Sequence, residues 1–162
     1  MPKFNPNPSQ VEAGFFQLLH ANQDGYELKI TGVKAFIDDV KVQADGSTKQ
    51  SYGVSVALVV AEGEFAGKRV SSNKLYYHTE GGQGFAKPFL MSVYGFDQTP
   101  AAEQDFNTFA EPQDWGFDTD SGGVGDGFAN LKGKRIRVFA DVTKDKIDPT
   151  KEFQKYTKWT KI

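Results

Sequence analysis

The sequence predicts one small domain that is built mainly of β-strands. Glycine and aromatic residues are abundant, with 17 glycines and 14% aromatics. Over several stretches, apolar residues alternate with polar ones, which is the period of a strand with one buried face. The chain has 162 residues, enough to bury one core and too few for two. We therefore expect a single all-β domain over residues 1–162.

The first strand is expected over residues 26–42. Apolar side chains take every second position from 26 to 30 and again from 33 to 37, but the alternation changes parity at Gly32. A glycine at such a change is typical of a β-bulge, so we expect a long strand that bends there. The preceding residues 1–14 are rich in proline and asparagine, which predicts an arm with little structure of its own.

Two further strands are expected over residues 52–60 and 68–78. The first of them alternates cleanly between apolar and small residues. Between the two strands, residues 62–67 (EGEFAG) supply the glycines that a hairpin turn requires. Residues 79–84 contain three more glycines, and this composition predicts a flexible loop.

A short helix is expected over residues 85–94, where the apolar residues change to helical spacing. Pro88 suits the first turn of a helix, and Gly95 suits a C-terminal stop. The last two strands are expected over residues 135–142 and 153–162, with a polar loop between them.

The predicted order is therefore three strands, one helix and two strands. This is the chain order of the OB-fold, a five-stranded and partly open Greek-key barrel. A long, bent first strand also fits, because the first strand of such a barrel pairs on both of its sides. An SH3-like barrel and a small sandwich are the alternatives. OB barrels bind oligonucleotides on the face of strands two and three, with help from the loops after strands one and four.

The composition excludes several classes of function. The chain has no cysteine, which excludes disulfides, thiolate metal sites and a cysteine nucleophile. Its only two histidines, His20 and His78, lie far apart and have no obvious serine and acid beside them. We therefore expect no catalytic activity, no cofactor and no bound metal. The chain also lacks a long apolar run and a signal-peptide pattern near residue 1, which favours a cytosolic protein.

Charge is distributed unevenly along the chain, although the net charge is only −2. Residues 1–96 are neutral overall, residues 97–127 carry eight acids and no base, and residues 128–162 carry a net charge of +6. Blocks of one sign often mark surfaces that face solvent or a partner. The basic and acidic regions are therefore expected to bind different partners, or to bind each other.

The acidic segment, residues 97–127, also interleaves carboxylates with aromatic residues, as in Asp105–Phe106 and Asp114–Trp115. Three interpretations remain open. The segment could compete with nucleic acid for a basic groove, or it could bind a partner protein. It could also be a structured excursion whose aromatic side chains, Trp115 foremost, complete the core.

Several stretches resemble a known family. Residues 26–30 (YELKI), 62–70 (EGEFAGKRV) and 131–138 (LKGKRIRV), together with the short helix, are similar to those of small bacteriophage proteins that bind single-stranded DNA through an OB-fold. The resemblance implies a role in phage DNA replication or recombination, in the cytoplasm of the infected host cell. Many such proteins recruit replication or recombination proteins through an acidic C-terminal tail. This chain ends in basic residues, so residues 97–127 are a candidate substitute for that tail.

Binding of single strands requires cations to neutralise phosphates and aromatic rings to stack on bases. Strand parity with Arg69 favours Tyr77 over Tyr76 as a stacking residue, and nearby aspartates weaken the case for Phe36. The predicted nucleic-acid-binding residues are Lys49, Tyr52, Arg69, Lys74, Tyr77, Arg135, Arg137, Phe139, Lys144, Lys146 and Trp159.

Two other classes of function compete with this prediction. A carbohydrate- or protein-binding β module would use exposed aromatic side chains without cations. A phage structural protein would use residues 1–14 as an assembly arm. The oligomeric state, the size of the binding site and the preference for DNA over RNA are left open by the sequence, and a homo-oligomer is compatible with it.

Overall fold

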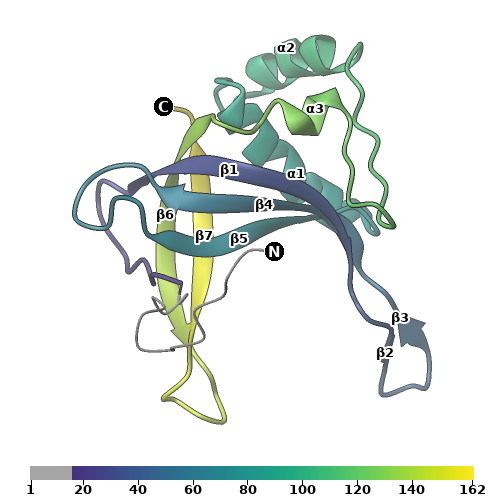
Figure 1. The fold of residues 1–162 in the computed structure, drawn as a ribbon, viewed down its shortest axis with the longest axis vertical. Helices are drawn as coiled ribbons and strands as arrows, with labels where there is room; N and C mark the ends of the chain where they lie inside the picture. The colour runs from purple at the N-terminus through teal and green to yellow at the C-terminus, as the bar shows by residue number, and fades with distance from the viewer. Residues whose placement is uncertain (1–15) are drawn as a thin grey trace, which may run out of the picture.

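The structure, a computed structural model, describes residues 16–162, so the predicted arm over residues 1–14 lies outside the described residues. Its centre is one five-stranded antiparallel sheet, and three helices gather at one end of it (Figure 1). In chain order the elements are β1 (Tyr26–Ile37), β2 (Lys41–Val42), β3 (Thr48–Lys49), β4 (Tyr52–Val60), β5 (Arg69–Tyr76), α1 (Glu80–Val93), α2 (Pro100–Ala110), α3 (Asp126–Ala129), β6 (Arg135–Lys144) and β7 (Glu152–Thr160). The predicted five-stranded sheet is confirmed. The prediction of one short helix is wrong, and the protein is of the mixed α/β class.

Strand β1 is the centre of the sheet, whose strand order is β5-β4-β1-β6-β7. It pairs with β4 along most of its length and with β6 near its start. The register shifts between Ile30 and Gly32, which confirms the predicted bulge. The strand ends at Ile37, earlier than predicted, because the chain then leaves the sheet to form the small β2–β3 hairpin. Figure 1 shows this hairpin extending away from the helices.

The core lies between the inner side of the sheet and α1. Alternate residues of the strands, such as Ile30, Val56 and Val138, are fully buried there, as the alternation predicts. Phe89 of α1 is also fully buried, and its ring meets the Trp159 ring edge to face at 4.8 Å.

Side chains and a short segment link the two edge strands, β5 and β7. The Tyr156 hydroxyl donates a hydrogen bond to the carbonyl oxygen of Ser71. Before β1, the Gln17 amide donates to the carbonyl oxygen of Arg69 in β5 (2.7 Å), and the Leu19 amide donates to the side-chain oxygen of Gln154 in β7 (2.7 Å). The segment that contains Gln17 and Leu19, just before β1, therefore bridges the edge strands β5 and β7.

Helix α1 begins at Glu80, although the glycines of residues 79–84 predict a loop. The Thr79 side chain caps the helix by accepting a hydrogen bond from the Gly82 amide (3.0 Å). Gly82 approaches β5 so closely that a Cβ would lie 2.4 Å from the Tyr76 carbonyl oxygen. Because the helix begins as early as Glu80, Pro88 lies inside it and not in its first turn. The predicted stop at Gly95 is confirmed by its φ of +86°.

The acidic segment is folded. It contains α2, whose Phe106 is only 4% exposed. The Trp115 ring lies 5.1 Å from the Phe128 ring, and its Nε1 donates a hydrogen bond to the carbonyl oxygen of Ala110 (2.8 Å). The interpretation in which its aromatic side chains complete the core is therefore confirmed. None of the helices in residues 16–162 has the length and apolar character that a membrane crossing requires.

Candidate nucleic-acid interface

The outer surface of β1, β4 and β5 carries two adjacent rows of side chains, one aromatic and one basic. The strand register sets these rows, because it aligns one residue from each strand at each level. The aromatic row is Phe36, Gly53 and Tyr76, and the basic row is Lys34, Ser55 and Lys74. We call these six residues the first face.

The two rings of the aromatic row meet over a buried glycine. The Phe36 and Tyr76 rings are half-buried, and their centroids lie 5.5 Å apart at an interplanar angle of 88°. A Cβ on Gly53, which lies between them, would be 1.8 Å from the carbonyl oxygen of Leu75. The site therefore accepts only glycine in the centre of this row.

The basic row lies beside the rings. The Lys74 Nζ is 4.9 Å from the centroid of the Phe36 ring and 3.6 Å from Asp38 Oδ1. This ion pair is partly exposed, and exposed pairs stabilise a fold by less than about 1 kcal/mol. Lys34 is exposed on β1, on the other side of β4 from Lys74. Together the two rows offer ring faces and ammonium groups to one ligand.

The acidic segment borders the first face. The Ala35 amide of β1 donates a hydrogen bond to the carbonyl oxygen of Gly122 (2.9 Å). A Cβ on Gly122 would lie 3.1 Å from Lys34 Cε, so the lysine stem runs along this loop. Asp118 begins the same loop, and hydrogen bonds from the Asp120 amide and the Ser121 hydroxyl hold the pKa of its carboxyl below the usual range.

The prediction that Tyr77 is the exposed stacking residue is wrong. Its ring packs against Phe117 and Phe128 at 5.5 and 5.7 Å, and its hydroxyl is buried without a hydrogen-bond partner in the described part of the chain. Burial raises the pKa of this hydroxyl. The cause is a bulge in β5, where two residues lie opposite the single residue Ala57 of β4. The extra residue reverses the alternation of every later side chain, so Tyr76 faces outward and Tyr77 faces inward.

The prediction that Trp159 lies on the outward parity of the last strand is also wrong. Trp159 pairs with the fully buried Val138, and its ring contacts Phe89 and Tyr156 in the core. A second bulge explains why the prediction failed. Thr157 of β7 has no partner residue in β6, and this extra residue reverses the alternation between it and Trp159.

Strands β6 and β7 carry a second basic and aromatic surface, which includes the predicted residues Arg135, Arg137 and Phe139. We call it the second face, and it consists of Arg135, Arg137, Phe139, Lys155 and Lys158. Protein groups engage most of these side chains. Arg135 Nη1 lies 3.4 Å from Glu27 Oε2, Arg137 Nη1 donates to the carbonyl oxygen of Asp24 (2.9 Å), and the Lys158 Nζ is 5.9 Å from the Phe139 ring centroid.

The remaining predicted residues are spread over the molecule. Lys49 is exposed on the β2–β3 hairpin, and both Lys144 and Lys146 are exposed at the β6–β7 turn. Tyr52 is 37% exposed at the start of β4, and its ring lies 6.2 Å from Phe117. Arg69 lies at the far end of β5 from Tyr76, with its guanidinium 5.7 Å from the Phe16 ring. These residues do not form one site with the first face.

Of the predicted residues, Lys74 alone belongs to the first face. Lys34, Phe36 and Tyr76 were not among the predicted residues. The sequence did contain one signal for this face: Gly53 and Ser55 are small residues at alternate positions of one strand. The residues beside them on the two neighbouring strands follow only from the register.

Comparisons with known proteins do not assign a family. Neither the models of known families nor the curated proteins include a match to this chain. Within residues 16–162, no three metal-ligating side chains gather into a group that could hold an ion.

Proposed function

We propose that the protein binds single-stranded DNA with little sequence preference, in phage DNA replication or recombination. The observation that carries the proposal is the first face, where an aromatic row lies beside a basic row. Every base has a face that can stack on an aromatic ring, and each such stack is worth about 1–3 kcal/mol. The ammonium groups of Lys34 and Lys74 would neutralise phosphates of the same strand.

We further propose that the sheet is an OB-type Greek-key barrel. Support comes from the long β1 that pairs on both sides, from the position of α1 between the third and fourth strands of the sheet, and from the bonds that link β5 to β7. In such a barrel, β4 and β5 are strands two and three, the strands whose face binds oligonucleotides. The first face lies on these strands.

The test is a titration of a fluorescent oligo-dT strand with the full chain, followed by anisotropy at several salt concentrations. Binding should be measurable at low salt and should weaken steeply as salt rises, because phosphate neutralisation releases counterions. Loss of binding in Tyr76→Ala, with binding retained in Phe139→Ala, would place the strand on the first face. If the wild-type chain does not bind at low salt, the proposal is wrong.

A further inference from the structure

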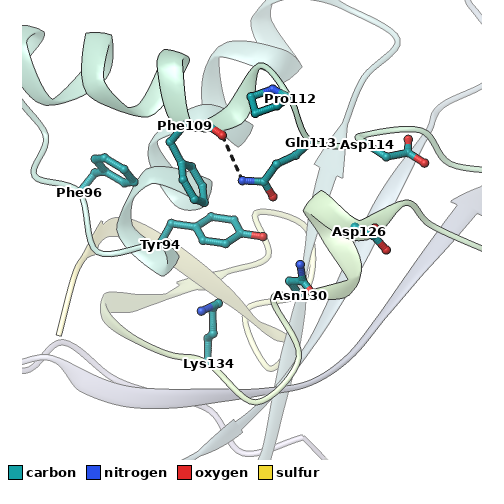
Figure 2. A pocket seen from close by; sticks show the side chains of 9 residues that line it. All are labelled: Tyr94, Phe96, Phe109, Pro112, Gln113, Asp114, Asp126, Asn130 and Lys134. Atoms are coloured by element: carbon teal, nitrogen blue, oxygen red, sulfur yellow. Dashed lines mark hydrogen bonds between the residues drawn. The ribbon is translucent and has the colours of Figure 1, made fainter.

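A hollow of about 880 Å³ lies between the ends of α1 and α2 and helix α3 (Figure 2). Three aromatic rings form one side of it, and Figure 2 shows the Phe109 and Tyr94 rings facing each other there. Their centroids are 4.9 Å apart, and Phe96 lies 5.5 Å from Phe109. Phe109 remains 37% exposed, so the hollow offers apolar surface to a ligand.

Negative charge surrounds these rings. Asp114 and Asp126 line the hollow and are exposed, and the acidic segment that forms much of its wall carries eight acids and no base. The lining also includes Lys134, whose Nζ lies 5.3 Å from the Tyr94 ring centroid. This cation is already engaged on a ring, so the hollow favours an occupant that is apolar at its centre and basic around it.

The same chain presents such a group at the β6–β7 turn, residues 145–151. Ile147 at the tip is 96% exposed, and exposed lysines flank it at positions 144, 146 and 151. The acids of the turn are engaged: Asp145 Oδ1 accepts hydrogen bonds from the amides of Ile147 (2.7 Å) and Asp148 (3.1 Å). Asp148 in turn accepts from Thr150. These bonds order the turn before any contact, which lowers the entropy cost of binding.

The hollow and the turn lie at opposite ends of the molecule. In Figure 1 the helices are at one end of the longest axis and the β6–β7 turn is at the other. A turn cannot reach the hollow of its own chain across that distance, but it can reach the hollow of a second copy. Because the two surfaces differ, the contact is head to tail and can repeat.

We propose that the β6–β7 turn of one copy docks in the acidic, aromatic hollow of a second copy. Ile147 contacts the rings, and the flanking lysines lie against Asp114 and Asp126. The contact does not depend on DNA. If the protein also binds single strands, the same contact aligns neighbouring copies along one strand and makes binding cooperative.

Sedimentation velocity of the full chain at increasing protein concentration tests the proposal. The average mass should rise with concentration at low salt and fall when salt is added. Lys146→Glu disables the turn and Asp126→Lys disables the hollow, and each should raise the dissociation constant about tenfold or more, because like charges then face each other. Asp105→Lys is the matched control: it makes the same charge change on exposed α2, outside the hollow, and should assemble like the wild type.

A mixture of the two disabled variants gives the sharpest outcome. The intact turn of Asp126→Lys fits the intact hollow of Lys146→Glu, and in the reverse contact the new glutamate of one variant meets the new lysine of the other. Both contacts between the variants therefore join opposite charges, so the mixture should assemble like the wild type while each variant alone does not. Circular dichroism establishes that each variant is folded. A wild-type chain that stays monomeric at every concentration overturns the proposal. So does a mixture that behaves like its separate components, or an Asp105→Lys chain that no longer assembles.

Discussion

The first and second faces are made of similar residue types, but they differ in which groups their side chains contact. On the second face, the arginines contact Glu27 and the Asp24 carbonyl, and Lys158 lies over Phe139. On the first face, the Phe36 and Tyr76 rings contact each other over a buried glycine, and Lys74 lies over Phe36. The comparison teaches that surfaces of similar composition can be built differently: the first face brings two rings from separate strands together across one glycine, whereas the second face has one ring among basic side chains. The glycine in the middle strand lets the two rings meet.

The largest effect is expected at the glycine between the two rings. Gly53→Ala places a Cβ 1.8 Å from the Leu75 carbonyl oxygen, and this overpacking should lower the free energy of unfolding by about 3 kcal/mol. Gly32→Ala is the matched control, because its Cβ would meet nothing closer than the Ala57 Cβ at 4.0 Å. Urea denaturation measures both. Equal stabilities of the two variants would show that the aromatic row does not need a glycine.

The second prediction separates the two faces by DNA affinity. Tyr76→Ala and Phe36→Ala should each weaken binding of oligo-dT by about 1–3 kcal/mol, since each removes a stacking surface. Phe139→Ala on the second face should change the affinity by less than about 0.5 kcal/mol. Anisotropy titrations at one salt concentration give all three values. If Phe139→Ala causes the larger loss, the second face is the binding site.

The third prediction concerns the bond between β7, which carries part of the second face, and β5, which carries part of the first. Tyr156→Phe removes its hydrogen bond to Ser71 and should lower the free energy of unfolding by about 1 kcal/mol. Tyr76→Phe is the control: the Tyr76 ring faces outward, so this substitution should leave the free energy of unfolding unchanged. Thermal unfolding distinguishes them, and equal midpoints would exclude a structural role for this bond.

The same tyrosine gives a pH dependence. Burial raises the pKa of both Tyr156 and Tyr77 above the ordinary value of 10.0. The unfolded chain therefore loses these protons first, so stability is full below pH 10 and falls as the pH rises above it. Tyr156→Phe should make this alkaline fall less steep in unfolding titrations. An unchanged slope would mean that Tyr156 ionises equally in both states.

The smallest effect is expected from single charges. Lys34→Gln and Lys74→Gln should each lower the slope of log affinity against log salt by about 0.7, the value for one contact with a single strand. Lys155→Gln on the second face should leave the slope unchanged. Titrations of oligo-dT across a salt series measure it, and a lower slope in Lys155→Gln alone would reverse the assignment of the two faces.

The sequence located one bulge of the sheet and missed two. The bulge of β1 is marked by Gly32, where the alternation of apolar and polar residues in the sequence changes parity. The bulges of β5 and β7 fall at serines and at Thr157, which have no such mark. Each missed bulge reversed the parity of the residues after it. Tyr77 and Trp159 were therefore predicted to face outward, and both are partly buried and pack against the core.

The sequence by itself determined the five strands, the bend of the first strand and the uneven charge. These features depend on local periods and on composition, which a single chain shows directly. Only the tertiary structure decided which residues share a face, that the acidic segment is folded, and that Phe36, Gly53 and Tyr76 form one row. The physical reason is that a face is made by neighbouring strands, and one extra residue in one strand moves every later side chain to the other side of the sheet.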